Sequence, residues 1–191
     1  IDHQIYDQVV EGITEIAKKI RVGSGLDPNT DMGPLISEEQ FDRVTGYLQK
    51  GLDSGAKIRC GGSPSKEGDL AAGYFVQPTV FADIKDEMEI VREEIFGPVV
   101  AVTPFEDMEE VAQRANDTTY GLAAGIWTQD ITKAHKLASL LKAGTVWINC
   151  YNAFDAASPF GGYKQSGYGR EMGHHVLELY TQVKSVWVGL T

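Results

Sequence analysis

The chain has 191 residues, and its 42% hydrophobic and 23% charged content is typical of a globular domain with a sizeable core. Seventeen Lys and Arg against 27 Asp and Glu give a formal net charge of −10, which excludes nucleic acid and anionic membranes as partners. No apolar run is long enough to span a bilayer, no secretory signal is visible, and the two cysteines form no disulfide framework. These features predict a cytoplasmic protein.

The first half of the chain predicts two amphipathic helices and a pair of short strands. Apolar residues recur at helical spacing over residues 3–20, and a capping box at 37–40 starts a second helix that ends near 51–55. Strands are expected at 56–60 and 75–81, and Pro78 makes the latter an edge strand or a broken one. Because the chain starts at Ile1 and enters a helix at once, we expect a piece of a longer polypeptide.

The second half alternates strands and helices. Strands are expected at 99–103, 123–127 and 146–149, with intervening helices capped by Asp107 and Asp130 and the second stopped by Gly144. This order predicts an α/β fold with a parallel βαβαβ sheet in three layers, whose ligands bind beyond the carboxyl ends of the strands.

The chain closes with a helix expected at 170–178 and a strand expected at 180–188. That last strand is apolar and has no partner among the sequential strands, so it invites pairing with another chain.

Residues 147–171 form the most unusual stretch. They start as a buried strand and continue for some twenty residues without helical or strand periodicity, which is uncommon inside a compact domain. The stretch is rich in rings, unlike a disordered segment, and contains Tyr151, Phe154, Phe160, Tyr163 and Tyr168. Two interpretations stay open from the residues: a long connection that packs its rings on the core, or the wall of a site for a small apolar ligand.

The sequence does not match the motifs of several kinds of binding site. The glycine-rich segments at 23–25 and 162–169 lack the positions that a phosphate loop or a dinucleotide fingerprint requires, and the four histidines have no metal-ligand spacing, so we predict no metal site. Cys150 opens the aromatic stretch, but it has no histidine nearby in the sequence to act as a base. A packed thiol is favoured over a nucleophile.

Two adjacent carboxylates, Glu93 and Glu94, precede a Phe-Gly-Pro turn at 96–98. They are either a solvated acidic pair or a site for a vicinal diol such as a ribose, with the ring of Phe96 beside the base.

Several motifs together resemble the carboxyl-terminal part of the aldehyde dehydrogenase superfamily. They are Glu-Glu-Ile-Phe-Gly-Pro (93–98), Asn-Asp-Thr-Thr-Tyr-Gly-Leu-Ala-Ala (116–124), Gly-Thr-Val-Trp-Ile-Asn (144–149), Ser-Pro-Phe-Gly-Gly-Tyr-Lys-Gln-Ser-Gly (158–167) and Gly-Arg-Glu (169–171). The segments around 33–34 and 73–79 fit as well, so the resemblance covers essentially the whole chain in order.

The resemblance implies oxidation of an aldehyde to a carboxylic acid with NAD or NADP, through a cysteine thiohemiacetal and thioester. It implies that Glu94 binds the nicotinamide-side ribose and that Phe96 packs against the same part of the cofactor. It also implies that the aldehyde is bound by Phe154 and Phe160, with Cys150 and Asn152 nearby. The loop at 149–154 is more similar to that of members acting on small to medium aldehydes than to betaine aldehyde types.

The family's nucleophile, its general-base glutamate and its nucleotide-binding domain lie upstream of a helix resembling residues 5–20. We therefore expect residues 1–169 to be the carboxyl-terminal portion of a catalytic domain and 170–191 a helix and an oligomerisation strand. The expected partners are the amino-terminal portion of the same protein, a small aldehyde, and a second copy bound through 180–191. The chain alone is predicted to be inactive; a non-catalytic self-associating module is the alternative, and a small thiol enzyme using Cys150 a weaker one.

Overall fold

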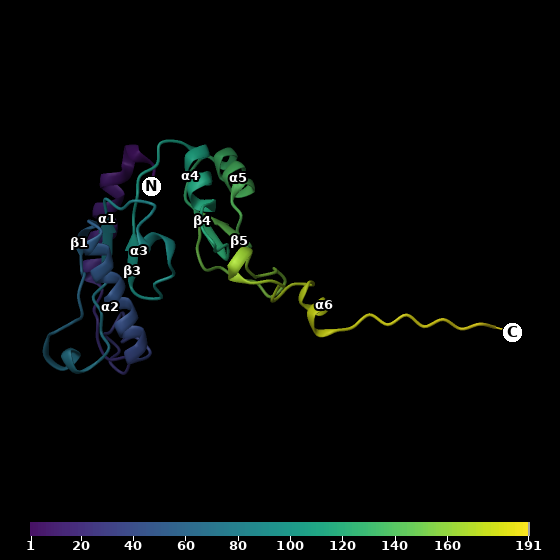
Figure 1. Cartoon of the computed structure of the whole chain (residues 1–191), viewed down its shortest axis with the longest axis horizontal. Helices are drawn as coiled ribbons and strands as arrows, with labels where there is room; N and C mark the ends of the chain where they lie inside the picture. Colours follow the sequence, from purple (N-terminus) through teal and green to yellow (C-terminus); the bar gives the residue numbers. More distant parts are fainter. Residues whose placement is uncertain (191) are drawn as a thin grey trace. The chain divides into compact units, whose positions relative to one another are not determined.

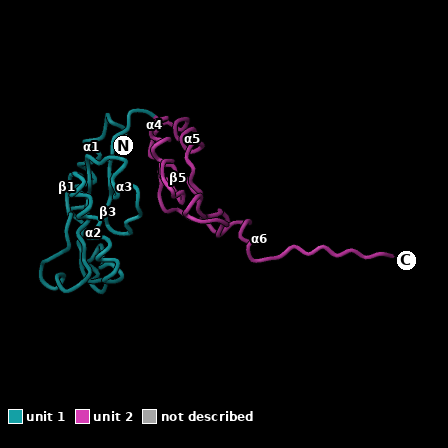
Figure 2. Tube along the Cα trace, in the orientation of Figure 1, with its two compact units in different colours: residues 1–107 teal, residues 108–191 magenta. Residues whose placement is uncertain are grey.

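The computed structural model describes residues 1–190, which divide into two compact units with the boundary between Asp107 and Met108 (Figure 2). Each unit is described by itself below. The boundary between the units differs from the predicted division at 169/170. That division separates a catalytic-domain portion from an oligomerisation segment, and it stays a prediction.

Unit 1 contains three helices and a three-stranded sheet (Figure 1). Its elements are a 3-10 turn at His3–Ile5, α1 (Tyr6–Lys19), α2 (Glu38–Asp53), β1 (Lys57–Cys60), a 3-10 turn at Gly68–Ala72, β2 (Thr79–Ala82), α3 (Glu89–Arg92) and β3 (Val99–Ala101). The strand order is β1-β2-β3, with β1 antiparallel and β3 parallel to β2. The predicted helices and strands of this half are confirmed to within a few residues.

The helix starts of unit 1 follow the predicted capping pattern. The Asp2 carboxylate accepts a hydrogen bond from Gln4 N at 2.9 Å, at the start of the turn that leads into α1. The Ser37 hydroxyl accepts one from Gln40 N at 3.2 Å, which satisfies an amide at the start of α2.

Strand β2 is the centre of unit 1, because all four of its residues are buried. Val80 and Ala82 pack with Val10 of α1, whereas Phe81 packs with Val44 and neighbouring residues of α2. Alternate residues of one strand therefore contact helices on opposite faces of the sheet. This alternation gives unit 1 a three-layer arrangement of helix, sheet and helix, although the strands of its sheet are not those of the predicted βαβαβ unit.

The expectation for Pro78 is half right. The run is broken, since the strand begins only at Thr79, but β2 is a central strand and not an edge strand. Pro78 precedes the ladder, so its missing N–H removes no strand hydrogen bond, and the next amide, Thr79 N, donates to Pro98 O at 2.8 Å.

Unit 2 is built on one parallel strand pair. Its elements are α4 (Met108–Asn116), β4 (Ala123–Ile126), α5 (Ile131–Leu140), β5 (Thr145–Ile148), a 3-10 turn at Lys164–Ser166, and α6 (Val176–Tyr180). Strands β4 and β5 run parallel in register from Ala123 opposite Thr145 to Ile126 opposite Ile148, and the Asp130 carboxylate caps α5 as predicted. The β4–α5–β5 part of the predicted βαβαβ unit is confirmed.

The prediction of a single sheet through all three predicted strands is wrong for residues 1–190. β3 pairs with β2 in one sheet, and β4 pairs with β5 in another. Chain order does not determine which strands become neighbours, because consecutive strands are adjacent only about two-thirds of the time.

Three local expectations for unit 2 also fail. Gly144 is not the stop of α5, which ends at Leu140; Gly144 lies where the backbone passes so close to Gly161 O that a Cβ would stand 1.7 Å away. The helix expected at 170–178 is present only as α6. Tyr180 belongs to that helix, and residues 181–190 form no strand within the described chain. A strand needs a paired neighbour, and this segment has none inside its own chain.

The loop after α1 is closed by one ion pair. Arg21 donates from Nε and Nη2 to the two carboxylate oxygens of Asp31, both at 2.8 Å, and Arg21 N donates to the same carboxylate at 2.9 Å. These bonds to the Arg21 side chain and backbone hold the pKa of Asp31 well below its usual range.

This pair predicts an acid-dependent stability. Because the folded-state pKa of Asp31 lies below its unfolded value of 3.8, the stabilisation is present at neutral pH and is lost as the pH falls below that value. Asp31→Asn should therefore lower the urea midpoint of unit 1 at pH 7, and the difference from the unsubstituted chain should shrink towards pH 2. Asp69→Asn, at an exposed position on the same unit, is the control. An equal difference at both pH values would contradict the assignment.

Candidate functional site

The first group of predicted residues lies on the loop between α3 and β3 in unit 1. Gln40 Nε2 donates to Ile95 O at 3.1 Å and to Phe96 O at 2.8 Å, and Arg43 Nη2 donates to Glu94 O at 2.8 Å. All three acceptors are backbone carbonyls. Two side chains of α2 therefore fix the backbone of the loop through bonds that do not involve the side chains of Glu94 and Phe96.

The fixed backbone presents Glu94 and Phe96 to the outside. The Glu94 side chain is exposed, and Phe96 is 71% exposed with a backbone φ of 57°, in the left-handed region. Gly97 follows, where a Cβ would come within 2.6 Å of a Val44 methyl group, so only glycine lets the loop lie this close to α2. A carboxylate that can accept two hydrogen bonds thus stands two residues from an exposed ring, on a turn whose backbone is hydrogen-bonded to α2.

The second group forms an aromatic cluster in unit 2, centred on Trp147. The Trp147 ring meets Tyr151 at a centroid distance of 5.0 Å and Phe154 at 5.6 Å, both edge to face, and Phe154 meets Phe160 at 5.1 Å in the same geometry. Trp127 also stacks on Tyr151, at a centroid distance of 6.3 Å. Edge-to-face contacts at these distances are favourable and orient each ring against the next.

A cavity of about 320 Å³ opens beside this cluster, along β5 and the loop that follows it. Its walls include the rings of Trp147, Phe154 and Phe160, and its polar groups come from Thr145, Asp155 and Ser158. The buried Thr145 hydroxyl finds no hydrogen-bond partner among residues 1–190. The volume and the mixture of several rings with few polar groups are typical of a small-molecule site.

The turn that leaves β5 is held by Asn149. Its Oδ1 accepts from Thr128 N at 2.9 Å and its Nδ2 donates to Thr128 O at 2.8 Å, so one side chain ties the ends of β4 and β5 together. Trp147 Nε1 donates to Ala153 O at 2.9 Å, which draws the loop back over the indole. The start of the long loop is therefore ordered by bonds to its own flanking strands.

The structure brings together only part of the predicted aldehyde site. Phe154 and Phe160 line one cavity, but Cys150 and Asn152 are exposed on the preceding turn and are not among its lining residues. The Cys150 thiol makes no hydrogen bond or ion pair with residues 1–190, so no base is positioned for it. Glu94 and Phe96 belong to the other unit.

Sequence reasoning missed Trp147 and Thr145 as lining residues. Both are on β5, two residues apart, so they face the same side of the strand. Strand alternation was the signal that could have found them.

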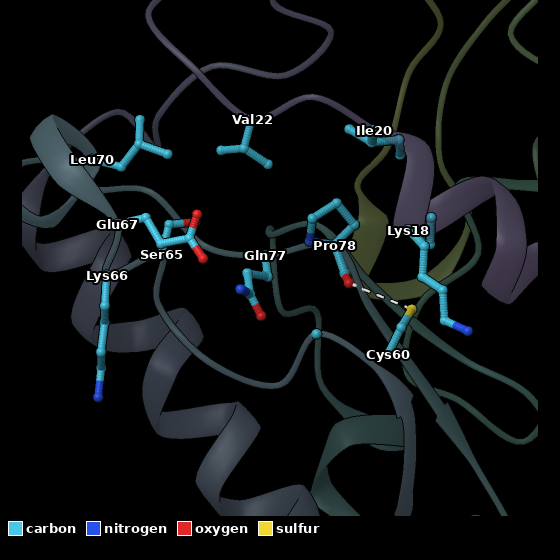
Figure 3. A pocket seen from close by; sticks show the side chains of 12 residues that line it. Lys18, Ile20, Val22, Cys60, Ser65, Lys66, Glu67, Leu70, Gln77 and Pro78 are labelled. Carbon is cyan, nitrogen blue, oxygen red and sulfur yellow. Dashed lines mark hydrogen bonds between the residues drawn. The ribbon is translucent and has the colours of Figure 1, made fainter.

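A second cavity, of about 410 Å³, lies in unit 1 between the end of α1 and the ends of β1 and the following loop (Figure 3). The Cys60 thiol donates to Pro78 O at 3.7 Å there. The Lys18 ammonium extends away from these groups and is bound to Glu15 at 2.9 Å. None of the predicted site residues lines this cavity.

Two features are absent from residues 1–190. No group of three or more His, Cys, Asp or Glu side chains is gathered so as to hold a metal ion. No helix in this range has the length and apolar character needed to traverse a bilayer.

The fold is an α/β fold with parallel strands, and unit 2 carries a cavity lined by aromatic rings. The Aldehyde dehydrogenase family profile matches residues 1–186, and the chain belongs to this family. A putative aldehyde dehydrogenase of Bacillus subtilis, DhaS, is 58% identical over 185 residues, and human mitochondrial aldehyde dehydrogenase is 50% identical over 188 residues.

Solved structures agree. The NAD⁺ complex of an aldehyde dehydrogenase from Bacillus cereus superposes with a TM-score of 0.94 at 52% identity and covers the whole chain. Betaine aldehyde dehydrogenase from Staphylococcus aureus, in complex with NAD⁺, superposes with a TM-score of 0.91 at 44% identity over 94% of the chain.

The chain is much shorter than these relatives. The match covers 97% of this chain but 37% of the B. subtilis protein, and 98% of this chain but 36% of the human one. In the B. cereus structure it covers 38% of that chain. These shares measure the length of the match and not its position in the longer chains.

The pair of hydrogen bonds between the Asn149 side chain and the Thr128 backbone predicts a specific loss of stability on substitution. Asn149→Ala removes both side-chain bonds and should lower the free energy of unfolding of unit 2 by about 1–3 kcal/mol. Asn152→Ala is the matched control, because Asn152 also has a left-handed backbone (φ 57°, against 54° at Asn149) but its side chain makes no hydrogen bond within residues 1–190. Urea denaturation followed by far-UV circular dichroism measures both. Equal losses would assign the effect to the backbone conformation and not to the bonds.

Proposed function

We propose that the chain is a portion of an NAD(P)-dependent aldehyde dehydrogenase that supplies the aromatic wall for the aldehyde and one contact for the cofactor. The observation that carries this proposal is the edge-to-face series from Trp147 through Phe154 to Phe160 beside an open cavity. Apolar rings with few polar groups suit the hydrocarbon part of an aldehyde, which gains by leaving water.

The cofactor contact is proposed for Glu94 and Phe96. An exposed carboxylate on a turn whose backbone is fixed fits the two hydroxyls of a ribose, and the exposed Phe96 ring fits a planar or apolar neighbour. Two relatives are described as NAD⁺ complexes, which supports the same cofactor class here. When bound, the nicotinamide accepts a hydride; the residues of this chain would only hold and orient its ribose.

The nucleophile is proposed to belong to polypeptide outside this chain. Cys150 is exposed without a base, and Cys60 donates to a backbone carbonyl in a cavity that holds none of the proposed site residues. The motifs favour the carboxyl-terminal portion of the parent, with the nucleophile, the general-base glutamate and the nucleotide-binding domain in the amino-terminal portion. A cytoplasmic location also stays a prediction, drawn from the cysteine usage and the composition.

This assignment predicts that the isolated chain does not turn over. With an aldehyde and NAD⁺ it should form no NADH above a buffer blank, and titration calorimetry with NAD⁺ should give no measurable heat, because a single ribose contact is a small part of a dinucleotide site. NADH formation that disappears in Cys150→Ser would instead establish a thiol enzyme.

The aromatic wall should nevertheless bind a small apolar aldehyde. In a chain carrying Trp127→Phe and Trp187→Phe, Trp147 is the only indole, and hexanal should change its fluorescence in a saturable way. Phe160→Ala should weaken this binding roughly tenfold, which corresponds to about 1.4 kcal/mol of lost apolar contact. Tyr168→Ala, fully exposed on the same loop, should leave it unchanged. Equal affinity for hexanal in the Phe160→Ala and Tyr168→Ala variants would contradict the proposal that Phe160 is a wall of the site.

A second candidate function, a self-associating module, is favoured by one observation. Residues 181–190 are extended and exposed, and they carry large apolar side chains that are 76–104% accessible, namely Val183, Val186, Trp187 and Val188. Apolar side chains in this number are rarely left in water unless they contact a partner. We propose that this segment joins a second copy of the chain, so that the protein is a homo-oligomer through 180–191.

Self-association of this kind depends on the terminal segment. The full chain should sediment as a dimer or a higher species, and deletion of residues 180–191 should make it monomeric. Trp187→Glu should have the same effect, because it introduces a charge into an apolar contact, whereas Lys184→Gln should not. A full chain that stays monomeric at high concentration would contradict the proposal.

A further inference from the structure

Lys164 makes an unusual pair of contacts for an exposed lysine. Its Nζ donates to Asn116 O at 2.8 Å and to Thr118 O at 3.0 Å, at the carboxyl end of α4. The last carbonyls of a helix lack intrahelical donors and carry the negative end of the helix dipole, so an ammonium is well placed there. Asn116 in turn bonds Leu140 O and Lys142 N with its side chain, which links the ends of α4 and α5.

The backbone around Lys164 follows the same segment. Tyr163 N donates to Gly121 O at 2.8 Å, Gln165 N donates to Thr119 O at 2.9 Å, and the Ser166 hydroxyl accepts from Gly121 N at 3.0 Å. Residues 163–166 are therefore attached along their length to residues 116–121. The Lys164 side chain contributes the only charged group among these bonds.

Lys164 itself has a backbone φ of 52°, in the left-handed region that residues with a Cβ adopt rarely. This backbone conformation is intrinsically unfavourable for a lysine. The two side-chain hydrogen bonds offset this strain and depend on the backbone keeping that course.

The same loop carries one wall of the cavity. Phe160, four residues before Lys164, exchanges backbone hydrogen bonds with Glu171 at 2.7 Å in each direction, and its ring packs on Phe154. Between these anchors the chain passes Gly144 at the close approach described above. A shift of the 163–166 segment would therefore move the Phe160 ring relative to Phe154 and Trp147.

We propose that Lys164 is a positioning residue for the cavity: its ammonium, held by the carbonyls at the end of α4, fixes the loop that places Phe160 as a wall. That this wall receives an aldehyde rests on the proposed function. Lys164 contacts no substrate, and it acts through the position of Phe160.

The test uses the chain with Trp147 as its only indole, and compares Lys164→Met with two variants. Lys164→Arg keeps a charged donor that reaches two carbonyls, and Lys133→Met removes a charge from an exposed position on α5. In Lys164→Met the amides of Tyr163 and Gln165 should exchange with deuterium roughly tenfold faster, because hydrogen bonds to a charged group are lost. The near-UV circular dichroism band of Trp147 should shrink and the affinity for hexanal should fall.

A merely structural role predicts a different pattern. It would speed exchange equally at the β4 and β5 amides, whereas the positioning role leaves those amides unchanged and is restored by arginine. If Lys164→Met fails to fold, Lys164→Gln, which keeps one donor group, should give intermediate exchange rates. Loop exchange and a Trp147 band that match the unsubstituted chain in the Met variant would overturn the proposal. Absence of hexanal binding in the unsubstituted chain would remove the proposed function alone, since exchange and circular dichroism need no ligand.

Discussion

Hydrogen bonds from long side chains to backbone carbonyls of another segment are the interaction on which both candidate loops depend. Gln40 and Arg43 donate to the turn that carries Glu94 and Phe96. Lys164, in the segment that follows Phe160, donates to carbonyls at the end of α4. Carbonyls of irregular segments and of helix ends need donors, and here side chains distant in the sequence supply them. In the first loop this leaves both site side chains projecting outward from an ordered backbone.

Such an arrangement explains why the rings can be exposed and ordered at once. Phe160 packs against Phe154, and Phe154 packs against Trp147, whose indole N–H is bonded to Ala153 O. Each ring is oriented by the next, so the wall of the cavity does not need a ligand to form it. Because the apolar wall is already formed, less conformational entropy is lost when a small ligand binds.

The parts that sequence predicted are those fixed by neighbours in the chain. Ser37 and Asp130 start helices through bonds to amides two or three residues away, and the period of Val80, Phe81 and Ala82 is visible in the sequence itself. Phe154 and Phe160 were found because rings on a long loop stand out in composition. The family was found because its motifs are local strings.

The parts that sequence did not predict depend on contacts across the chain. Gln40 and Phe96 are 56 residues apart, and Lys164 and Asn116 are 48 apart, so no local pattern reveals these bonds. The division into two sheets and the close approach of Gly144 to Gly161 also depend on segments that are distant in the sequence. The terminal strand fails for a related reason, because pairing requires a partner that one chain does not supply.

The central claim is that the rings after β5 form a site for the hydrocarbon part of an aldehyde. Nuclear Overhauser contacts between hexanal methylene protons and ring protons of labelled phenylalanine test it most directly. The account predicts contacts to Phe154 and Phe160 and none to Phe75 or Phe81 in unit 1. Contacts confined to unit 1, or contacts to unit 2 that exclude both Phe154 and Phe160, would contradict it.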